Sequence, residues 1–269
     1  MDWLKGLGFA KGHGTANDFV IVPDPDGGLV LDAEAVALLC DRRRGIGGDG
    51  LLRVVRTAAE PEVADRAGQA EWFMDYRNAD GSLADMCGNG VRVYARYLVE
   101  AGLAAGPRVP ILTRAGLVTA EVGPDTIAVS MPMPVVGGPG TVRLGGVEYR
   151  GTAATAGNPN LVVTVPDPST VDLRGRPELD PGQFPQGANV EFITPVGPDH
   201  VRMRVTERGV GETESCGSGA CAVAAVVLAG RAGSVTVDVP GGRLVVSIDE
   251  DRCVLAGPAV IVAAGTLAL

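Results

Sequence analysis

Two stretches of the chain, DMCGNGVRVY at residues 85–94 and ESCGSGACAV at residues 214–223, share one arrangement. In each, a cysteine is followed by Gly-X-Gly and then by a run with helical apolar spacing. Cys87 and Cys216 therefore stand at the predicted starts of two helices, 129 positions apart (216 − 87). A motif this unusual, occurring twice, indicates that the chain repeats one structural unit.

The predicted helices cover residues 91–102 and 219–230, and a third covers residues 33–43 with Asp32 as its N-cap. The helix at 219–230 is apolar on every side, so we expect other structure to enclose it. Short β-prone runs dominate the rest of the chain: FVIV (19–22), LLRVV (51–55), EWFMDY (71–76), IAVSM (127–131), VEFIT (190–194), VRMRV (201–205) and SVTVDV (234–239). The pattern predicts an α/β (α+β) fold of two pseudo-symmetric domains, each with β-strands wrapped around a central helix.

The boundary between the halves is expected near MPMPVVGGPG (131–140), where proline and glycine concentrate. We therefore predict an N-terminal half over residues 1–130 and a C-terminal half over residues 131–257. The last segment, 258–269, is expected to return to the N-terminal half as a strand.

Composition excludes several classes of protein. The net charge of −9 argues against a nucleic-acid or anionic-membrane surface. No apolar run is long enough for a transmembrane helix, and the N-terminus lacks the pattern of a signal peptide. Five cysteines at scattered spacing favour free thiols in a reducing compartment, so we expect a cytoplasmic protein. Lys5 and Lys11 are the only lysines, which disfavours a pyridoxal Schiff base.

A cysteine at a helix N-terminus lies beside unpaired N–H groups and the positive end of the helix dipole, an environment that favours thiolate. If two such cysteines face one carbon, one can remove a proton while the other returns one to the opposite face, inverting the centre without a cofactor. A redox pair is the alternative for Cys87 and Cys216, and a buried core role is expected for Cys40, Cys221 and Cys253. A zinc site is disfavoured because Cys216 and Cys221 have the wrong spacing.

Longer motifs extend this interpretation. NADGSLADMCGNGVR (78–92) and ERGVGETESCGSGACA (207–222) resemble the two cysteine signatures of the diaminopimelate epimerases. Shorter motifs resemble the same family in the same order: GHGTANDF (12–19), RRRGIGGDG (42–50), AGNPNLV (156–162) and GANVEF (187–192). Members from actinobacteria are the most similar.

The resemblance implies two similar α/β domains with an active site in the cleft between them. It implies a cofactor-independent interconversion of LL- and meso-diaminopimelate for lysine and cell-wall precursor synthesis, by a protein that tends to form a homodimer. Carried over by motif, Cys87 and Cys216 are the catalytic cysteines and Glu207 assists them. The substrate-binding set implied is Asn17, Asn78, Gly88, Asn89, Asn158, Asn189, Glu207, Arg208, Gly217 and Ser218. No metal or cofactor is implied.

Two positions depart from the family pattern: Asn160 stands where a histidine is common, and Gly50 stands where some members carry glutamine. Asparagine forms hydrogen bonds but takes no proton, so the activation of one thiol must differ. Two alternatives stay open: a proline or hydroxyproline racemase, which also uses two cysteines, and a catalytically silent amino-acid-binding homologue.

Overall fold

The structure of the protein is a computed structural model that describes residues 4–268, and these form two compact units. Unit 1 comprises the described residues up to Val129 together with those from Pro258 onward. Unit 2 is Ser130–Gly257. The chain thus leaves unit 1, builds unit 2 and returns to add its last strand to unit 1.

Unit 1 contains one continuous set of paired strands and two α-helices. Its elements are β1 (Gly8–Gly14), β2 (Asn17–Pro23), α1 (Ala33–Cys40), β3 (Gly50–Arg56), β4 (Trp72–Asn78), α2 (Gly88–Glu100), β5 (Arg108–Thr113), β6 (Gly116–Val122), β7 (Ile127–Met131) and β18 (Val260–Thr266), with short 3₁₀ turns η2 (Thr57–Ala59) and η3 (Ala64–Arg66).

Unit 2 has a similar inventory with a single α-helix. Its elements are β8 (Val135–Leu144), β9 (Val147–Thr155), β10 (Pro159–Thr164), η4 (Pro168–Thr170), β11 (Glu178–Leu179), β12 (Asn189–Gly197), β13 (His200–Glu207), β14 (Gly211–Thr213), α3 (Gly217–Leu228), β15 (Gly233–Val239), β16 (Gly242–Ile248) and β17 (Cys253–Gly257).

Strand pairing shows that the two units repeat one topology. In unit 1 the neighbours run β18–β1–β2–β3–β4–β5–β6–β7, and their pairings are antiparallel, antiparallel, parallel, antiparallel, parallel, antiparallel and antiparallel. In unit 2 the neighbours run β8–β9–β10–β12–β13–β15–β16–β17 with the same succession of pairings. The helices also correspond, because α2 connects β4 to β5 and α3 connects β13 to β15. The predicted pseudo-symmetric fold is confirmed.

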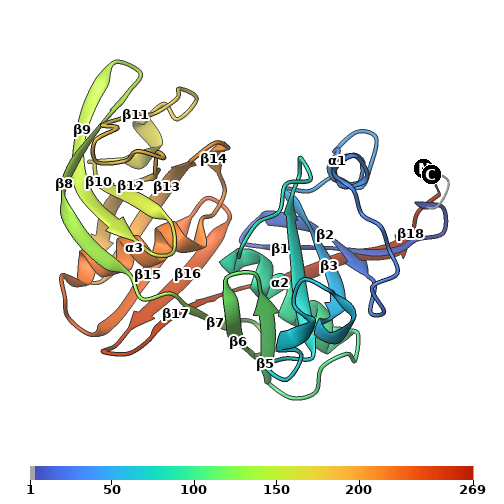
Figure 1. Ribbon diagram of the computed structural model, residues 1–269. Coiled ribbons are helices and arrows are strands. Elements are labelled where there is room, and N and C mark those ends of the chain that lie inside the picture. Colours follow the sequence, from blue (N-terminus) through green and yellow to red (C-terminus); the bar gives the residue numbers. More distant parts are fainter. Residues whose placement is uncertain (1–3, 269) are drawn as a thin grey trace. The chain divides into compact units, whose positions relative to one another are not determined.

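Each unit wraps its strands around a central helix (Figure 1). Helix α2 contacts β1 to β6 and β18, and its buried face includes Val91, Tyr94 and Leu98. Helix α3 contacts β8, β9, β10, β12, β15, β16 and β17. Most of α3 is buried, as its apolar sequence predicts. Burying an apolar helix inside a sheet removes its side chains from water, and this is the main stabilisation that the arrangement offers.

The central helices begin earlier than their predicted starts at residues 91 and 219. Cys87 and Cys216 are themselves the N-caps, with extended backbone at φ −140°, ψ 118° and φ −125°, ψ 117° respectively. A capping side chain that accepts a backbone N–H lets the first helical turn include the glycines. Periodicity missed this turn because glycine carries no apolar signal.

Helix α1 is shorter than predicted. Its N-cap is Asp32 as expected, with the carboxylate accepting from Ala35 N at 2.8 Å. It ends at Cys40 rather than residue 43 because Asp41 has extended backbone. The Asp41 carboxylate then accepts the N–H groups of Arg43 and Arg44 at 2.8 Å each, which holds these residues in a turn.

A tight hairpin at Gly145–Gly146 joins β8 to β9. Both glycines have left-handed backbone, with φ +57° and +81°, which a side chain would disfavour. Across residues 4–268, none of the helices combines the length and apolar character that crossing a bilayer would need.

Candidate active site

The first cysteine, Cys87, is half-buried where α2 begins in unit 1. Its Sγ accepts the N–H of Gly90 at 3.3 Å, and its thiol lies 3.8 Å from Oδ1 of Asn17 at the start of β2. Nδ2 of Asn89 donates to the same asparagine oxygen at 3.2 Å. Three of the predicted site residues therefore meet around one thiol.

The orientation of the Asn17 amide is determined by Asp49. Nδ2 of Asn17 donates to Oδ2 of Asp49 at 2.8 Å, and an ionised carboxylate can only accept. The oxygen of Asn17 must then point toward Cys87. Arg42 pairs with Asp49 at 2.8 Å and with Asp18 at 2.7 Å, which anchors the carboxylate. Cys87 consequently faces a hydrogen-bond acceptor.

The other predicted residues of unit 1 lie at the ends of elements. Asn78 ends β4, where its amide donates to Oγ of Ser82 at 2.9 Å and accepts from the hydroxyl of Tyr76 at 3.1 Å. Gly88 is the first residue of α2. The N–H groups of a first helical turn have no partner within the helix and suit a carboxylate.

The second cysteine, Cys216, is buried at the start of α3 in unit 2, with 4% of its surface exposed. Its Sγ accepts the N–H of Gly219 at 3.4 Å and lies 3.5 Å from Oγ of Ser218. Nδ2 of Asn189, from β12, approaches the sulfur at 3.9 Å. Gly217 is the first residue of α3, as Gly88 is the first residue of α2 in unit 1.

The orientation of the Asn189 amide is opposite to that of Asn17. Its Oδ1 accepts the backbone N–H of Arg208 at 2.9 Å, so Nδ2 must face the other way. That Nδ2 donates to Oδ1 of Asn160 at 3.2 Å, and Nδ2 of Asn160 donates to the carbonyl of Asn158 at 2.6 Å. Cys216 therefore faces a donor, whereas Cys87 faces an acceptor.

Asn160 thus orients another side chain at this site. It is fully buried on β10, directly beside Asn189 in the parallel register with β12. Both ends of its amide are used in the chain of hydrogen bonds that leads to Cys216. Asn158 contributes to this chain through its backbone carbonyl.

The pKa of Cys216 differs from the expectation. It is raised well above its ordinary value, first because burial penalises the thiolate and then because the carboxylates of Glu207 and Glu191 repel it. The hydrogen bonds from Ser218 and Gly219 lower it only in part. The expectation that the helix N-terminus favours thiolate is therefore wrong for Cys216, since burial outweighs the helix dipole.

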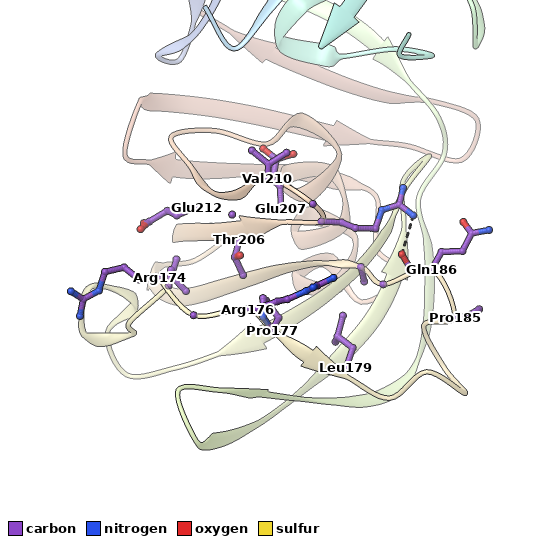
Figure 2. A pocket seen from close by; sticks show the side chains of 17 residues that line it. Arg174, Arg176, Pro177, Leu179, Pro185, Gln186, Thr206, Glu207, Val210 and Glu212 are labelled. Atoms are coloured by element: carbon purple, nitrogen blue, oxygen red, sulfur yellow. Dashed lines mark hydrogen bonds between the residues drawn. The ribbon is translucent and has the colours of Figure 1, made fainter. Parts of the chain in front are cut away.

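Glu207 and Arg208 follow at the end of β13. Oε1 of Glu207 accepts the hydroxyl of Thr213 at 2.5 Å, and the exposed guanidinium of Arg208 donates to the carbonyl of Gln186 at 3.3 Å. Both residues line a hollow of about 800 Å³ inside unit 2. Figure 2 shows Glu207 on one side of it and Arg176 with Leu179 on the other. The hollow presents both signs of charge, as a zwitterionic ligand requires.

The remaining cysteines are confirmed as core residues, since Cys40, Cys221 and Cys253 are all buried. Burial also raises the pKa of Cys40 to about 12. Among residues 4–268 no three His, Cys, Asp or Glu side chains are placed to hold a metal ion.

Two residues with an evident part in these sites were not predicted. Asp49, which orients Asn17, is an acid within the glycine-rich segment RRRGIGGDG, and that context was its only signal. Glu191 lies in the apolar strand run VEFIT, where an acid two positions after Asn189 shares its face of the strand.

Solved structures share this fold of two halves, each with a sheet around a helix. A PhzF-family phenazine biosynthesis protein from Bacillus anthracis superimposes with a TM-score of 0.72 at 19% identity, over 98% of this chain and 99% of that one. A hydroxyproline epimerase from Agrobacterium vitis gives 0.70 at 17% identity, over 100% and 94%. The fold is therefore that of the PhzF proteins and the proline-type racemases and epimerases.

Sequence relatives define the family within this class. The family model of diaminopimelate epimerase matches residues 9–136 and 152–262. The diaminopimelate epimerase of Thermobifida fusca is 52% identical over 97% of this chain and 98% of its own length, and that of Streptomyces coelicolor is 50% identical over 96% and 94%. The chain belongs to the diaminopimelate epimerase family, and it is an isomerase of the racemase and epimerase class.

Proposed function

We propose that the protein interconverts LL- and meso-2,6-diaminopimelate without a cofactor, with Cys87 and Cys216 as the acid–base pair. The observation that carries this proposal is the repetition of one half-site: a cysteine that N-caps a buried central helix at the same point of a repeated topology. The family supplies the substrate. The product would serve lysine and peptidoglycan precursor synthesis in the cytoplasm.

In the proposed step, one cysteine acts as a thiolate and takes the α-proton of the substrate, breaking its C–H bond. The electron pair moves toward the α-carboxylate, where N–H groups at the starts of α2 and α3 stabilise the charge. Gly88 and Asn89 supply these groups in unit 1, and Gly217 and Ser218 supply them in unit 2. The second cysteine then donates its thiol proton to the opposite face of the carbon, so the centre is inverted and the proton count is unchanged.

The surroundings of the two cysteines distinguish their roles. Both sulfurs accept a helix N–H, from Gly90 and from Gly219. The thiol of Cys87 also has an acceptor in Asn17, whereas Nδ2 of Asn189 faces Cys216, and the hydroxyl of Ser218 can turn its proton toward that sulfur once it is charged. Because Asn160 takes no proton, we propose that Glu207 assists deprotonation of Cys216. Either cysteine can begin the reaction, as reversibility requires.

The distal end of the substrate is the second part of the proposal. Arg208 can grip the distal carboxylate with two parallel N–H bonds. Glu207 can accept from an ammonium group of the substrate. Asn17, Asn78, Asn158 and Asn189 would complete the polar set. The mixed charge of the hollow beside Glu207 and Arg208 supports this assignment.

The decisive experiment follows exchange of the α-hydrogen in deuterated water, with LL- and meso-diaminopimelate and with L-proline and hydroxyproline. Wild type should exchange and epimerise diaminopimelate alone, with no added pyridoxal phosphate and after exhaustive chelation. Cys87→Ser and Cys216→Ser should lose at least about a hundredfold in kcat/KM, whereas Cys40→Ala, which alters a core cysteine, should not.

Three results would contradict the proposal. Activity on proline compounds would favour the racemase alternative. Binding of diaminopimelate without exchange would identify a silent binding protein. Loss of activity on chelation, with recovery on adding a divalent metal, would exclude the thiol mechanism.

A further inference from the structure

Glu191 is an anomaly in the core of unit 2. It lies on β12 with none of its surface exposed, and within residues 4–268 neither of its carboxylate oxygens has a hydrogen-bond partner. An ionised carboxylate without a partner is too costly to bury, so such a group keeps its proton instead. The mechanism above does not use this acid.

The position of Glu191 connects it to Cys216 through the first turn of α3. A Cβ added at Gly219 would lie 2.6 Å from Oε1 of Glu191, so the carboxyl group packs directly on this glycine. The N–H of Gly219 donates to Sγ of Cys216 at 3.4 Å. Asn189, two residues before Glu191 on the same strand, also reaches that sulfur. The carboxyl and the thiol therefore share their nearest neighbours.

Few other titratable groups act on Glu191. Its register partners, Val162 on β10 and Val205 on β13, are apolar. Helix α3 carries no charged side chain, and its one titratable residue, Cys221, is hydrogen-bonded to Cys253. At the end of β13, Glu207 is the charged group that acts on Glu191.

These surroundings have consistent electrostatic effects. Burial, and then repulsion by Glu207, raise the pKa of Glu191 well above its ordinary value. Once it is ionised, Glu191 in turn raises the pKa of Cys216 further. Glu191 and Cys216 are both buried and interact with each other, so the ionisation of one opposes the ionisation of the other.

We propose that Glu191 is a positioning residue that acts through Cys216: as a neutral carboxylic acid it permits Cys216 to form its thiolate, and its ionisation at higher pH disables that half of the cysteine pair. The proposal rests on the proposed function for its catalytic consequence, since it gives the enzyme an alkaline limit that Cys216 alone would not impose. The effect of Glu191 on the ionisation of Cys216 does not depend on any substrate.

The test compares wild type with Glu191→Gln, which keeps shape and polarity but cannot ionise, and with Glu191→Met, which is apolar and of similar length. The rate of modification by methyl methanethiosulfonate is followed against pH for each cysteine peptide by mass spectrometry. Glu191 opposes the Cys216 thiolate only once it is itself ionised, so in both variants the midpoint for Cys216 should fall by about one pH unit. The gain in thiolate should reach about tenfold at pH values where wild-type Glu191 is ionised, and should vanish where it is protonated. Cys87, in the other unit, is the internal control and should not move.

Thermal unfolding gives a second readout that needs no thiol chemistry. Native Glu191 holds its proton to higher pH than the unfolded chain does, so the wild type must lose stability as pH rises above the ordinary glutamate value of 4.5. Glu191→Gln lacks this loss, so the difference in Tm between the variant and wild type should grow in the variant's favour as pH rises from about 5 to about 9.

Coincident Cys216 profiles in wild type and both variants would overturn the proposal, as would a Tm difference that does not change with pH. Glu191→Met carries the same test if the glutamine variant fails to fold. Because the reagent replaces the substrate, a failure here is distinguishable from a protein that does not epimerise diaminopimelate.

Discussion

Replacing Asn160 with leucine tests whether the hydrogen-bond chain to Cys216 matters for activity. Leucine has the same number of side-chain heavy atoms as asparagine and a similar branched outline, with bulkier methyl groups that cannot donate or accept. The fully buried position therefore stays filled while its two side-chain bonds disappear. The carbonyl of Asn158 loses a donor at 2.6 Å, and Nδ2 of Asn189 loses an acceptor at 3.2 Å.

The structure indicates the size of the effect. The bond to Asn158 contributes about 1 kcal/mol net, and its carbonyl keeps the N–H of Ala156 at 3.1 Å. Leaving Nδ2 of the buried Asn189 without its acceptor costs about 1–3 kcal/mol, so unit 2 should be destabilised by about 2–4 kcal/mol. A donor directed at a charged group is worth about 1.5–3 kcal/mol, which is a factor of about 10 to 100 in rate. Because Arg208 N still holds Oδ1 of Asn189, we expect the lower end, about a tenfold loss in kcat/KM.

The assay combines urea unfolding with kcat/KM for LL-diaminopimelate. Thr170→Val is the matched control, since it removes an exposed hydrogen bond in the same unit, from Oγ1 to the carbonyl of Asp167 at 2.8 Å. The control should change stability by no more than about 1 kcal/mol and leave the rate unchanged.

Two results would refute the reasoning. A leucine variant that loses stability but keeps kcat/KM within about twofold would show that Asn160 only completes the core, since a factor of two is well below 1 kcal/mol. A variant that loses neither would show that the hydrogen-bond chain is not formed in the working protein.

Two further predictions address the cysteine pair. Under a mild oxidant without substrate, the proposed mechanism predicts a Cys87–Cys216 disulfide that abolishes activity and that dithiothreitol reverses; both thiols found free by mass spectrometry in fully inactivated protein would argue against facing cysteines. Asn160→His should keep activity near neutral pH and move the acid limb of kcat/KM downward, because imidazole can take the thiol proton; an unmoved limb in a folded, active variant would mean that this position does not tune the thiol.

Much of the fold was predictable because its signals are local. The apolar spacing after each cysteine predicts a helix, the β-prone runs predict strands, and the repeated Cys-Gly-X-Gly bend predicts two similar halves. Helix starts were misplaced by two or three residues because the capping interaction of Cys87 and Cys216 depends on geometry.

The candidate site, too, could be predicted from the sequence only in part. The two cysteines and their flanking glycines could be identified from the sequence, because their place before a predicted helix puts them beside N–H groups that bind anions. Which end of an amide faces each thiol could not be read, because Asp49 and Asn160 act across strands that only the folded sheet makes neighbours. The sequence could not show that the pKa of Cys216 is raised either, because its burial depends on all the residues that pack around α3.

The repeated architecture and the candidate site residues could therefore be read along the chain, because side-chain type and spacing are local properties. The orientation of the amides that face the two cysteines, and the shift in the pKa of Cys216, depend on the folded structure. Glu191 illustrates the reason: on a surface the same carboxyl group would keep its ordinary pKa, whereas the strands of unit 2 and helix α3 exclude water from it and raise its pKa well above that value.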